Sequence, residues 1–176
     1  GVGYSDNPDT AAAGRQAMME ALKQSGREEP CDFILLFATA RHDARLLRES
    51  VASVAGPSVP IIGGGAVGAI CKDRFGYAGD QIGLAAFWLD QTHCDLLSEG
   101  DLTQGEREVG KRLGEKLLAL GTTASSPVVL FYDSFDRTRG DIRMHMGTYL
   151  LEGLEQGMGF LPNLFGAGLM GDYACS

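Results

Sequence analysis

The chain has 176 residues, of which 44% are hydrophobic and 25 are glycine, and its formal net charge is -8. This length allows one large domain or two small lobes with a hydrophobic core. The negative charge argues against a nucleic-acid surface, which needs basic patches, and against binding to an anionic membrane. No apolar run approaches the roughly 20 residues that span a bilayer, and no signal peptide is visible, so we expect a cytoplasmic protein.

Hydrophobic periodicity predicts alternating helices and strands in the first half of the sequence. The first helix is expected to begin at an N-cap, Asp9 or Thr10, and to stop at Gly26. The elements predicted here are, in chain order, a helix over Thr10–Gln24, a strand over Phe33–Ala38 buried on both faces, a helix capped by Asp43 and ended by Gly56, a strand over Val59–Ile62, an antiparallel hairpin of Ala66–Cys71 with Gln81–Leu89, and a strand over His93–Ser98.

The second half repeats this alternation. Thr103 and Glu106 have the spacing of a capping box and predict the start of a helix there. Gly147 and Gly153 indicate that the backbone of a later helix packs closely against a neighbour. The predicted elements are a helix from the capping box to Gly121, a strand over Val128–Tyr132, a helix over Asp141–Gln156 and a strand over Asn163–Gly166.

The segment PIIGGGAVGAI, which starts at Pro60, recurs as NLFGAGLMGDY, which starts at Asn163. Each copy follows an apolar strand, a polar loop and a helical stretch. We therefore predict an α/β fold, a mixed β-sheet with packed helices, built from two duplicated strand–helix–strand units that each end in a glycine turn and hairpin. The repeats span about 28–98 and about 125–176 of the chain. At least one of the turn glycines is expected to have a positive φ angle.

Chemical motifs are sparse. The cysteines Cys31, Cys71, Cys94 and Cys175 form no CxxC pair, and we interpret them as reduced thiols rather than as a metal or redox cluster. The sequence contains no GxSxG, Walker A or HExxH motif, so we predict no catalytic residues, no metal site and no cofactor. Gly63, Gly65 and Gly68 match the spacing of a dinucleotide fingerprint, but they precede an expected hairpin rather than a helix.

Ligands of strand–helix units collect at the carboxyl ends of the strands, near helix N-termini. Four loop segments that follow predicted strands are expected to meet there. The glycines in these segments can offer backbone N–H groups to a carboxylate or phosphate. In the polar cluster that starts at Asp133, an arginine can pair with a ligand carboxylate. A solvated loop and a conformational role for the glycines are the alternative interpretations. The candidate ligand-binding residues are Arg41, His42, Gly63, Gly64, Gly65, Asp133, Ser134, Asp136, Arg137, Arg139, Gly166 and Gly168.

A family resemblance accompanies these patterns. The segments GVGYSDNPDTAAAGRQA, CDFILLFATA, VPIIGGGAVGAI, VVLFYDS and LFGAGLMGDY resemble, in this order, the FIST N-terminal domain, and the resemblance covers nearly the whole chain, residues 1–176. It implies an intracellular sensory module of signal-transduction proteins that binds small ligands such as amino acids. The family supplies no catalytic residues to transfer. The second glycine segment departs from the first, because Asp172 stands where the first has Ala69.

The resemblance also implies partners: a FIST C-terminal domain, and an output domain, in the same chain. We expect a fragment of a longer protein whose uncovered sheet edge allows a homodimer. The predicted function is therefore a small-ligand-binding sensory module, with an amino acid or another small carboxylate as ligand. An enzyme domain acting on a small or nucleotide-linked substrate and a protein-interaction scaffold remain as alternatives.

Overall fold

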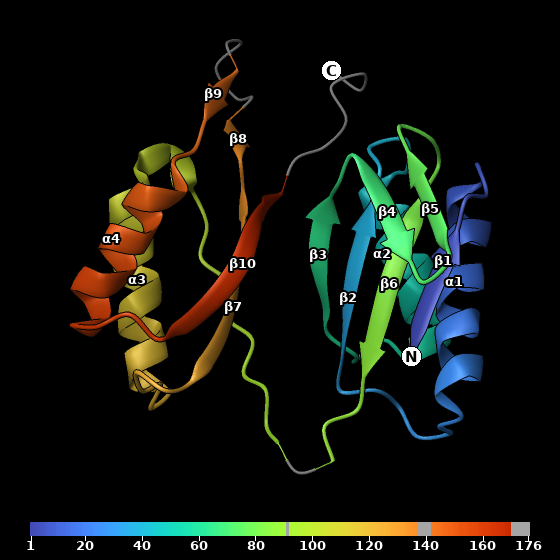
Figure 1. Cartoon of the computed structure of the whole chain (residues 1–176), viewed down its shortest axis with the longest axis horizontal. Helices are drawn as coiled ribbons and strands as arrows, with labels where there is room; N and C mark the ends of the chain where they lie inside the picture. Colours follow the sequence, from blue (N-terminus) through green and yellow to red (C-terminus); the bar gives the residue numbers. More distant parts are fainter. Residues whose placement is uncertain (91, 137–141, 170–176) are drawn as a thin grey trace. The chain divides into compact units, whose positions relative to one another are not determined.

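The computed structural model describes residues 1–90, 92–136 and 142–169 (Figure 1). The chain divides into two compact units, Gly1–Cys94 and Asp95–Leu169. Each unit combines strands with helices packed on them, as the α/β prediction requires, and each is described by itself below.

The first unit contains a four-stranded mixed sheet, two helices and a small hairpin. The sheet has the order β1-β6-β2-β3, in which β2 and β3 are parallel while β6 runs antiparallel to both of its neighbours. Its elements are β1 (Val2–Ser5), α1 (Thr10–Ser25), β2 (Phe33–Ala38), α2 (Ala44–Ala55), β3 (Ile61–Gly65), β4 (Gly68–Cys71), β5 (Arg74–Tyr77) and β6 (Ile82–Phe87).

Side-chain alternation gives this sheet two different faces. On one face, Ile34, Leu36, Ile82 and Leu84 are buried in the core under α1 and α2. On the opposite face the strand residues are half-buried, and the ring of Phe33 stacks on that of Phe87 with 4.6 Å between centroids. The strand β2 is therefore buried on one face, and the predicted burial on both faces is wrong.

The local capping signals of the first unit are confirmed. The Asp9 carboxylate accepts from the N–H of Ala12 at the start of α1, and Asp43 accepts in the same way from Leu46 at the start of α2. Gly26 ends α1 in a left-handed conformation. Each of these side chains bonds a backbone group only three residues away, so the sequence alone is sufficient to fix the helix start.

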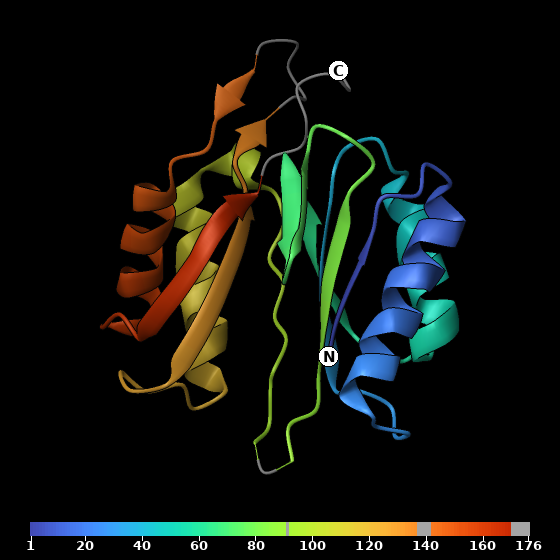
Figure 2. The ribbon, with the colours of Figure 1, turned by 45° about the vertical axis from the view of Figure 1, so that its right-hand side comes forward.

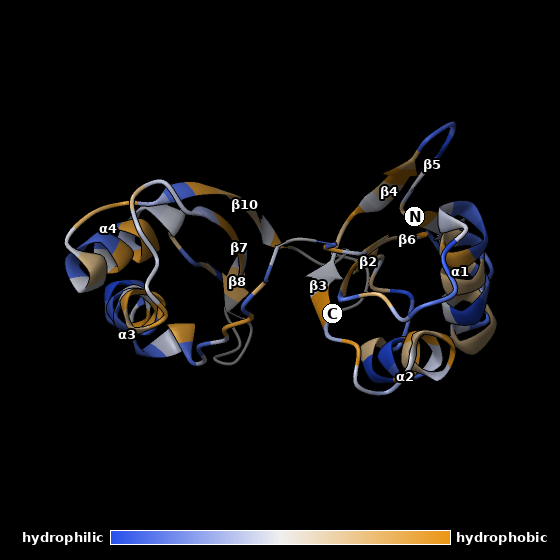
Figure 3. Cartoon of the chain, turned by 90° about the horizontal axis from the view of Figure 1, so that it is seen from below, coloured by the Kyte–Doolittle hydropathy of each residue, from blue (hydrophilic) through white to orange (hydrophobic). Residues whose placement is uncertain are grey.

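The predicted hairpin is wrong in its pairing. Gly68–Cys71 pairs with Arg74–Tyr77 across a tight turn at Lys72, and Ile82–Phe87 instead enters the main sheet between β1 and β2. The small hairpin lies on the face of the sheet opposite to α2 (Figure 3). One of its sides faces the sheet, and the other leaves Ile70 and Phe75 largely exposed.

The second unit pairs two parallel strands under two helices. Its elements are η1 (Leu102–Gln104), α3 (Glu106–Ala119), β7 (Pro127–Asp133), β8 (Phe135–Asp136), β9 (Arg143–Met144), α4 (Gly147–Met158) and β10 (Asn163–Leu169). The helices lie side by side on one face of β7 and β10 (Figure 2). The short strands β8 and β9 pair antiparallel to each other.

Glycines bring the axes of α3 and α4 close together. Gly110 and Gly114 on α3 face the backbone of α4, and Gly153 and Gly157 on α4 face the backbone of α3. A Cβ at Gly114 would lie 2.5 Å from the carbonyl oxygen of Leu154, and at the other three positions it would overlap a carbonyl oxygen outright. The close backbone packing predicted for Gly153 is thus confirmed.

Three predictions about the residues after β6 are wrong. Residues 92–101 form no strand. The helix α3 is capped by Gly105 without a side-chain hydrogen bond, because the Thr103 hydroxyl bonds Asp101 instead. The helix predicted from Asp141 begins at Gly147, because Arg143–Met144 is extended and pairs with Phe135–Asp136.

The expected glycine turns are strands. Gly63–Gly65 belongs to β3 and lies in register with Leu36–Ala38, while Gly166–Gly168 belongs to β10 and lies in register with Leu130–Tyr132. Hydrogen bonding to the neighbouring strand keeps both segments extended. The prediction of a positive φ angle is confirmed at Gly63, whose φ is 142°.

The two glycine strands share a further feature. A Cβ on Gly63 would overlap the carbonyl oxygen of Leu36, and a Cβ on Gly166 would overlap that of Leu130. In both units a strand, a helix and a parallel strand follow one another in the chain. A duplication would produce these similarities, and the duplication itself stays a prediction that superposing the two segments would test.

Candidate functional site

The candidates of the first unit lie at the carboxyl ends of β2 and β3. His42 is buried, and both of its ring nitrogens have partners: Nδ1 lies 3.1 Å from the hydroxyl of Thr10, and Nε2 lies 2.9 Å from the carbonyl oxygen of Asp80. The carbonyl oxygen can only accept, so Nε2 carries a proton. This histidine joins the first residue of α1 to the loop before β6, while Arg41 beside it is exposed.

The N-terminus of α2 is already occupied. The Asp43 carboxylate bonds the first turn of this helix, which is where an anionic ligand would bind. Next to it, Thr39 donates from its hydroxyl to the carbonyl oxygen of Gly79 at 2.5 Å. Gly64 and Gly65 lie in the edge strand β3, outside this hydrogen-bonded corner. The hydrogen bonds of His42, Asp43 and Thr39 therefore hold together the loops at the carboxyl ends of β2 and β3.

The second unit contains a cavity at the corresponding place. A space of about 380 Å³ lies between the first turns of α4 and the strands β7 and β10. Its lining includes two of the predicted glycines, Gly166 and Gly168. The complete lining is Leu130, Tyr132, Gly147, Leu150, Leu151, Leu164, Phe165, Gly166, Ala167 and Gly168.

Tyr132 is the polar side chain of this cavity, and two glycines make room for it. A Cβ on Gly147 would lie 2.7 Å from the Tyr132 hydroxyl, and a Cβ on Gly168 would lie 3.0 Å from it. The hydroxyl is thus placed between the start of α4 and the carboxyl end of β10. The sequence analysis missed Tyr132 as a site residue, although it ends the strand predicted over Val128–Tyr132.

Ser134 lies against the same glycine. Its side chain is only 8% exposed, and its Oγ would overlap a Cβ on Gly168. The Ser134 backbone bonds both Leu169 and His145. No buried side-chain oxygen of the described residues is left without a hydrogen-bond partner, so the Ser134 hydroxyl is not an unsatisfied buried group and gives no preference for a ligand by itself.

The N-terminus of α4 is not capped by its own N-cap residue, but the Glu106 carboxylate reaches it from α3 and accepts from the N–H of Met146. Met146 is the N-cap residue and contributes no side-chain hydrogen bond. The N–H groups of the first turn, together with the helix dipole, favour an anion at this position. The first turn of α4, two hydroxyls and an apolar cavity therefore occur together at the carboxyl end of β10, with the Glu106 carboxylate beside them.

Glu106 and His145 hold this corner in place. His145 is buried, and its Nδ1 lies 3.2 Å from Oε1 of Glu106, which also accepts from the N–H of Met146 at 3.2 Å. Burial raises the pKa of Glu106, but hydrogen bonds from its own N–H, from Met146 and from His145 outweigh burial and hold the pKa below its ordinary value. The carboxylate thus ties the start of α3 to the start of α4.

We expect Glu106→Gln to destabilise the second unit by about 1–2 kcal/mol at pH 7, because a charge-assisted hydrogen bond is stronger than a neutral one. The pKa is lowered on folding, so the stabilisation is present above the unfolded value of about 4.3 and is lost as pH falls through the folded pKa. Urea unfolding followed by circular dichroism from pH 3 to 8 measures this effect.

The exposed Glu115 on the same helix provides the matched control, Glu115→Gln. The stability curve of the wild-type protein and that of Glu106→Gln should converge at the acid end of the pH range. There Glu106 is protonated in both the folded and the unfolded protein. A difference between the curves that stays constant with pH would contradict the role given to the ionised carboxylate.

The polar cluster after β7 is only partly described. Asp133 is exposed, and its carboxylate accepts from the N–H of Phe135 at 3.1 Å. Asp136 contributes its backbone to β8. Arg137 and Arg139 lie outside the described residues, so the predicted pairing of an arginine with a ligand remains a prediction.

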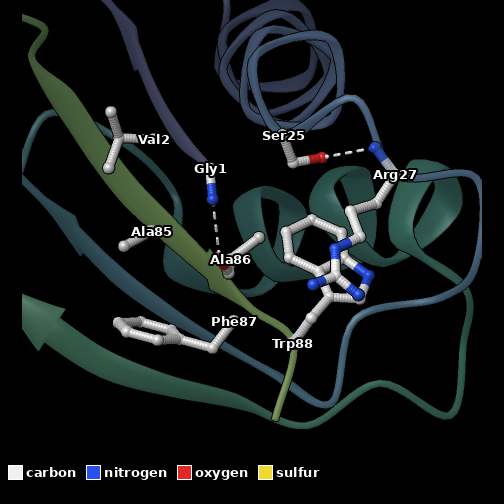
Figure 4. Close-up of a pocket in the computed structure, with 8 residues that line it drawn as sticks. All are labelled: Gly1, Val2, Ser25, Arg27, Ala85, Ala86, Phe87 and Trp88. Carbon is white, nitrogen blue, oxygen red and sulfur yellow. Dashed lines mark hydrogen bonds between the residues drawn. The ribbon is translucent and has the colours of Figure 1, made fainter. Parts of the chain in front are cut away.

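A second cavity, of about 370 Å³, lies in the first unit beside β6 (Figure 4). Arg27 and Trp88 line it, and Figure 4 shows their side chains next to each other. The guanidinium of Arg27 already forms a two-pronged ion pair with Asp90 and a further one with Glu29. Because carboxylates already neutralise this guanidinium, it is not free to pair with a ligand. The cavity in the first unit is therefore the weaker candidate site of the two.

Neither a group of metal ligands nor a membrane-spanning helix is found in the part of the chain that the structure describes. Within residues 1–90, 92–136 and 142–169, no three His, Cys, Asp or Glu side chains lie together as metal ligands would. Of the helices in the same ranges, none has both the length and the apolar character that crossing a membrane requires.

The fold and the cavity define an α/β protein with parallel strand–helix–strand units and an open ligand-sized space in the second of them. The sequence model of the FIST N domain family matches residues 32–174, and the chain belongs to this family. The resemblance predicted from the sequence is thus confirmed. No curated protein matches the chain. FIST N domains are a sensory domain family rather than a known enzyme family, in agreement with a sensory module of signal transduction.

Proposed function

We propose that the chain is the small-ligand-binding part of an intracellular signal-transduction protein, and that its ligand is an amino acid or another small carboxylate. Membership of the FIST N domain family supports the sensory role. The observation that carries the proposed site is the cavity beside the first turns of α4. Its volume of about 380 Å³ falls within the range of small-molecule sites.

Three groups would bind the carboxylate. The N–H groups of Gly147 and Thr148 lie at the positive end of the helix dipole, since those of Tyr149 and Leu150 bond the carbonyl oxygen of Met146. The hydroxyls of Tyr132 and Ser134 can donate to the ligand's oxygens. A sensor of this type signals through further domains of the same protein. We therefore propose a FIST C-terminal domain and an output domain as its partners.

The alternative of an enzyme domain has less support. A nucleophile needs a base within hydrogen-bonding distance, and the Ser134 hydroxyl bonds no described histidine. The imidazole of His145 is instead directed to Glu106. The interaction-scaffold alternative keeps one favourable observation, the exposed pair Ile70 and Phe75 on the small hairpin.

We expect some members of a panel of amino acids and small carboxylates to raise the melting temperature of the 1–176 chain, because a ligand that binds only the folded state stabilises it. For a ligand found in this way, Tyr132→Phe should weaken binding about fivefold to tenfold, as the loss of one hydrogen bond predicts. Isothermal titration calorimetry measures the affinity.

Tyr77→Phe is the matched control, because this exposed tyrosine belongs to the hairpin of the first unit and does not line the cavity. It should leave the affinity unchanged. Equal affinities of wild-type protein and Tyr132→Phe would place the ligand elsewhere on the chain.

A further inference from the structure

The small hairpin formed by β4 and β5 has an apolar outer face. Ile70 pairs directly with Phe75 across the two strands, and Tyr77 lies two residues after Phe75 on β5. Side chains that are paired in this way, or that are two residues apart in a strand, point to the same side of a sheet. These three residues, here called the hairpin face, are 85%, 79% and 78% exposed in chain order. Large apolar residues gathered in water are typical of an interaction surface.

The other side of the hairpin is fixed to the first unit. Cys71 and Arg74 pair with each other on this side, and Cys71 is buried. Arg74 forms an ion pair with Glu20 of α1, and its guanidinium carbon lies 4.8 Å from the centre of the Tyr4 ring on β1. Because these contacts hold the inner side of the hairpin in place, the hairpin face stays directed away from the sheet.

The charges around the hairpin face favour a second copy of this chain as its partner. The hairpin contributes two cations, Lys72 and Arg74, and one carboxylate, Asp73. The whole chain has a net charge of -8, so two copies repel each other overall, and this repulsion is smallest where the local charge is not negative. The hairpin face itself carries no charged side chain. The same face of a second copy therefore matches it without opposing like charges.

The size of the hairpin face determines how strong such a contact can be. Burying an aromatic side chain removes roughly 150–250 Å² from water, and burying an aliphatic one removes on the order of 100 Å². At their exposed fractions the three residues offer roughly 300–500 Å² per copy, so two copies would bury about 600–1,000 Å². Stable complexes bury at least about 1,200 Å², and smaller interfaces belong to weak, transient pairs. The area therefore suits a weak dimer.

We propose that the hairpin face is the contact of a weak, reversible homodimer, in which a two-fold axis brings Ile70, Phe75 and Tyr77 of one copy against the same residues of the other. A contact of this kind needs only one surface per chain, because that surface is its own partner. The inference goes beyond the proposed ligand-binding function and does not depend on it. It also differs from the homodimer expected from the sequence, which was to form at an uncovered sheet edge.

Sedimentation velocity of the 1–176 chain at increasing concentration tests the dimer. We expect reversible dimerisation with a Kd of about 10–100 µM, as for other small interfaces. Phe75→Lys should weaken it about 30-fold, because Phe75 neighbours both other residues of the hairpin face and a charge there is costly to bury. Leu118→Lys is the matched control, because it places the same charge at an exposed leucine of α3 and should leave the Kd unchanged.

Circular dichroism checks that both variants are folded, and Ile70→Lys takes the place of Phe75→Lys if the latter unfolds. A wild-type chain that stays monomeric up to about 1 mM would overturn the inference. A dimer that the substitution on the hairpin face and Leu118→Lys affect equally would overturn it as well, because the contact would then lie elsewhere on the chain.

A mixture of the Phe75→Lys and Phe75→Glu proteins tests the two-fold symmetry. Each variant alone should be monomeric, because the contact would bring like charges together. The mixture should associate at low salt, because each introduced cation then meets an introduced carboxylate. Leu118→Lys and Leu118→Glu are the control pair and should dimerise like the wild type, alone or mixed. A Phe75 mixture that associates no better than either variant alone would show that the two hairpin faces do not meet, which overturns the inference.

Discussion

Replacing Gly153 with alanine should destabilise the second unit by about 2–3 kcal/mol. A Cβ at this position would overlap the carbonyl oxygen of Arg107 in the facing helix. Backbone cannot move aside as a flexible side chain can, so α3 and α4 would have to separate and loosen the packing around Leu150 and Leu154. The gain of about 1 kcal/mol in helix propensity offsets only part of this loss.

Gly14→Ala is the matched control, because Gly14 is also a buried glycine within a helix. A Cβ there would lie 3.0 Å from a methyl carbon of Leu47 and 3.0 Å from the Cβ of Ser50, so it meets side chains first. We expect this variant to change stability by less than about 1 kcal/mol. Urea unfolding by far-ultraviolet circular dichroism measures both variants, and a Gly153→Ala protein as stable as wild type would contradict the close helix contact.

The second large effect is expected at Gly63 in the first unit. Its φ of 142° lies in a region that L side chains rarely adopt, which costs about 1–3 kcal/mol for alanine. In addition, the new Cβ would overlap the carbonyl oxygen of Leu36 in the paired strand β2. We therefore expect Gly63→Ala to destabilise this unit by about 3–4 kcal/mol, more than conformational strain alone would cause.

Gly26→Ala separates the two causes. Gly26 has a φ of 66°, but a Cβ there would have no atom within 4 Å, so only the conformational cost of about 1 kcal/mol remains. Trp88, the single tryptophan of the chain, lies in the first unit, and its fluorescence reports the unfolding of that unit. Equal destabilisation by the two substitutions would show that the overlap with Leu36 is relieved without cost.

Local patterns predicted the helices of the first unit well. Asp9 and Asp43 each bond an N–H group three residues away, so the signal and its partner occur together in the sequence. The hairpin was mispredicted because Gly68–Cys71 had two apolar candidates as partners. The two candidates are Arg74–Tyr77 and Ile82–Phe87, and the sequence does not show which of them pairs with Gly68–Cys71. In the structure Ile82–Phe87 lies between β1 and β2 in the main sheet, so Arg74–Tyr77 is the partner.

The candidate site, too, was predicted from the sequence only in part. The rule that ligands collect at the carboxyl ends of strands selected Ser134, Gly166 and Gly168, which the structure brings to one cavity or to its edge. It also selected His42, which is engaged on both sides of its ring. Glycine spacing alone does not distinguish a turn from a strand, so the predicted glycine turns were wrong.

The sequence by itself determined the family, through segments that follow one another along nearly the whole chain. It also determined the alternation of helices and strands and the helix caps of the first unit, because these two depend on neighbours within a few residues. The tertiary structure decided which strand pairs with which, and it brought Glu106 to His145, 39 residues further along the chain. It also brought the Glu106 carboxylate to the start of α4, whereas Asp43 caps α2 from the residue next to that helix. Such contacts depend on the packing of whole elements, which no local pattern of residues encodes.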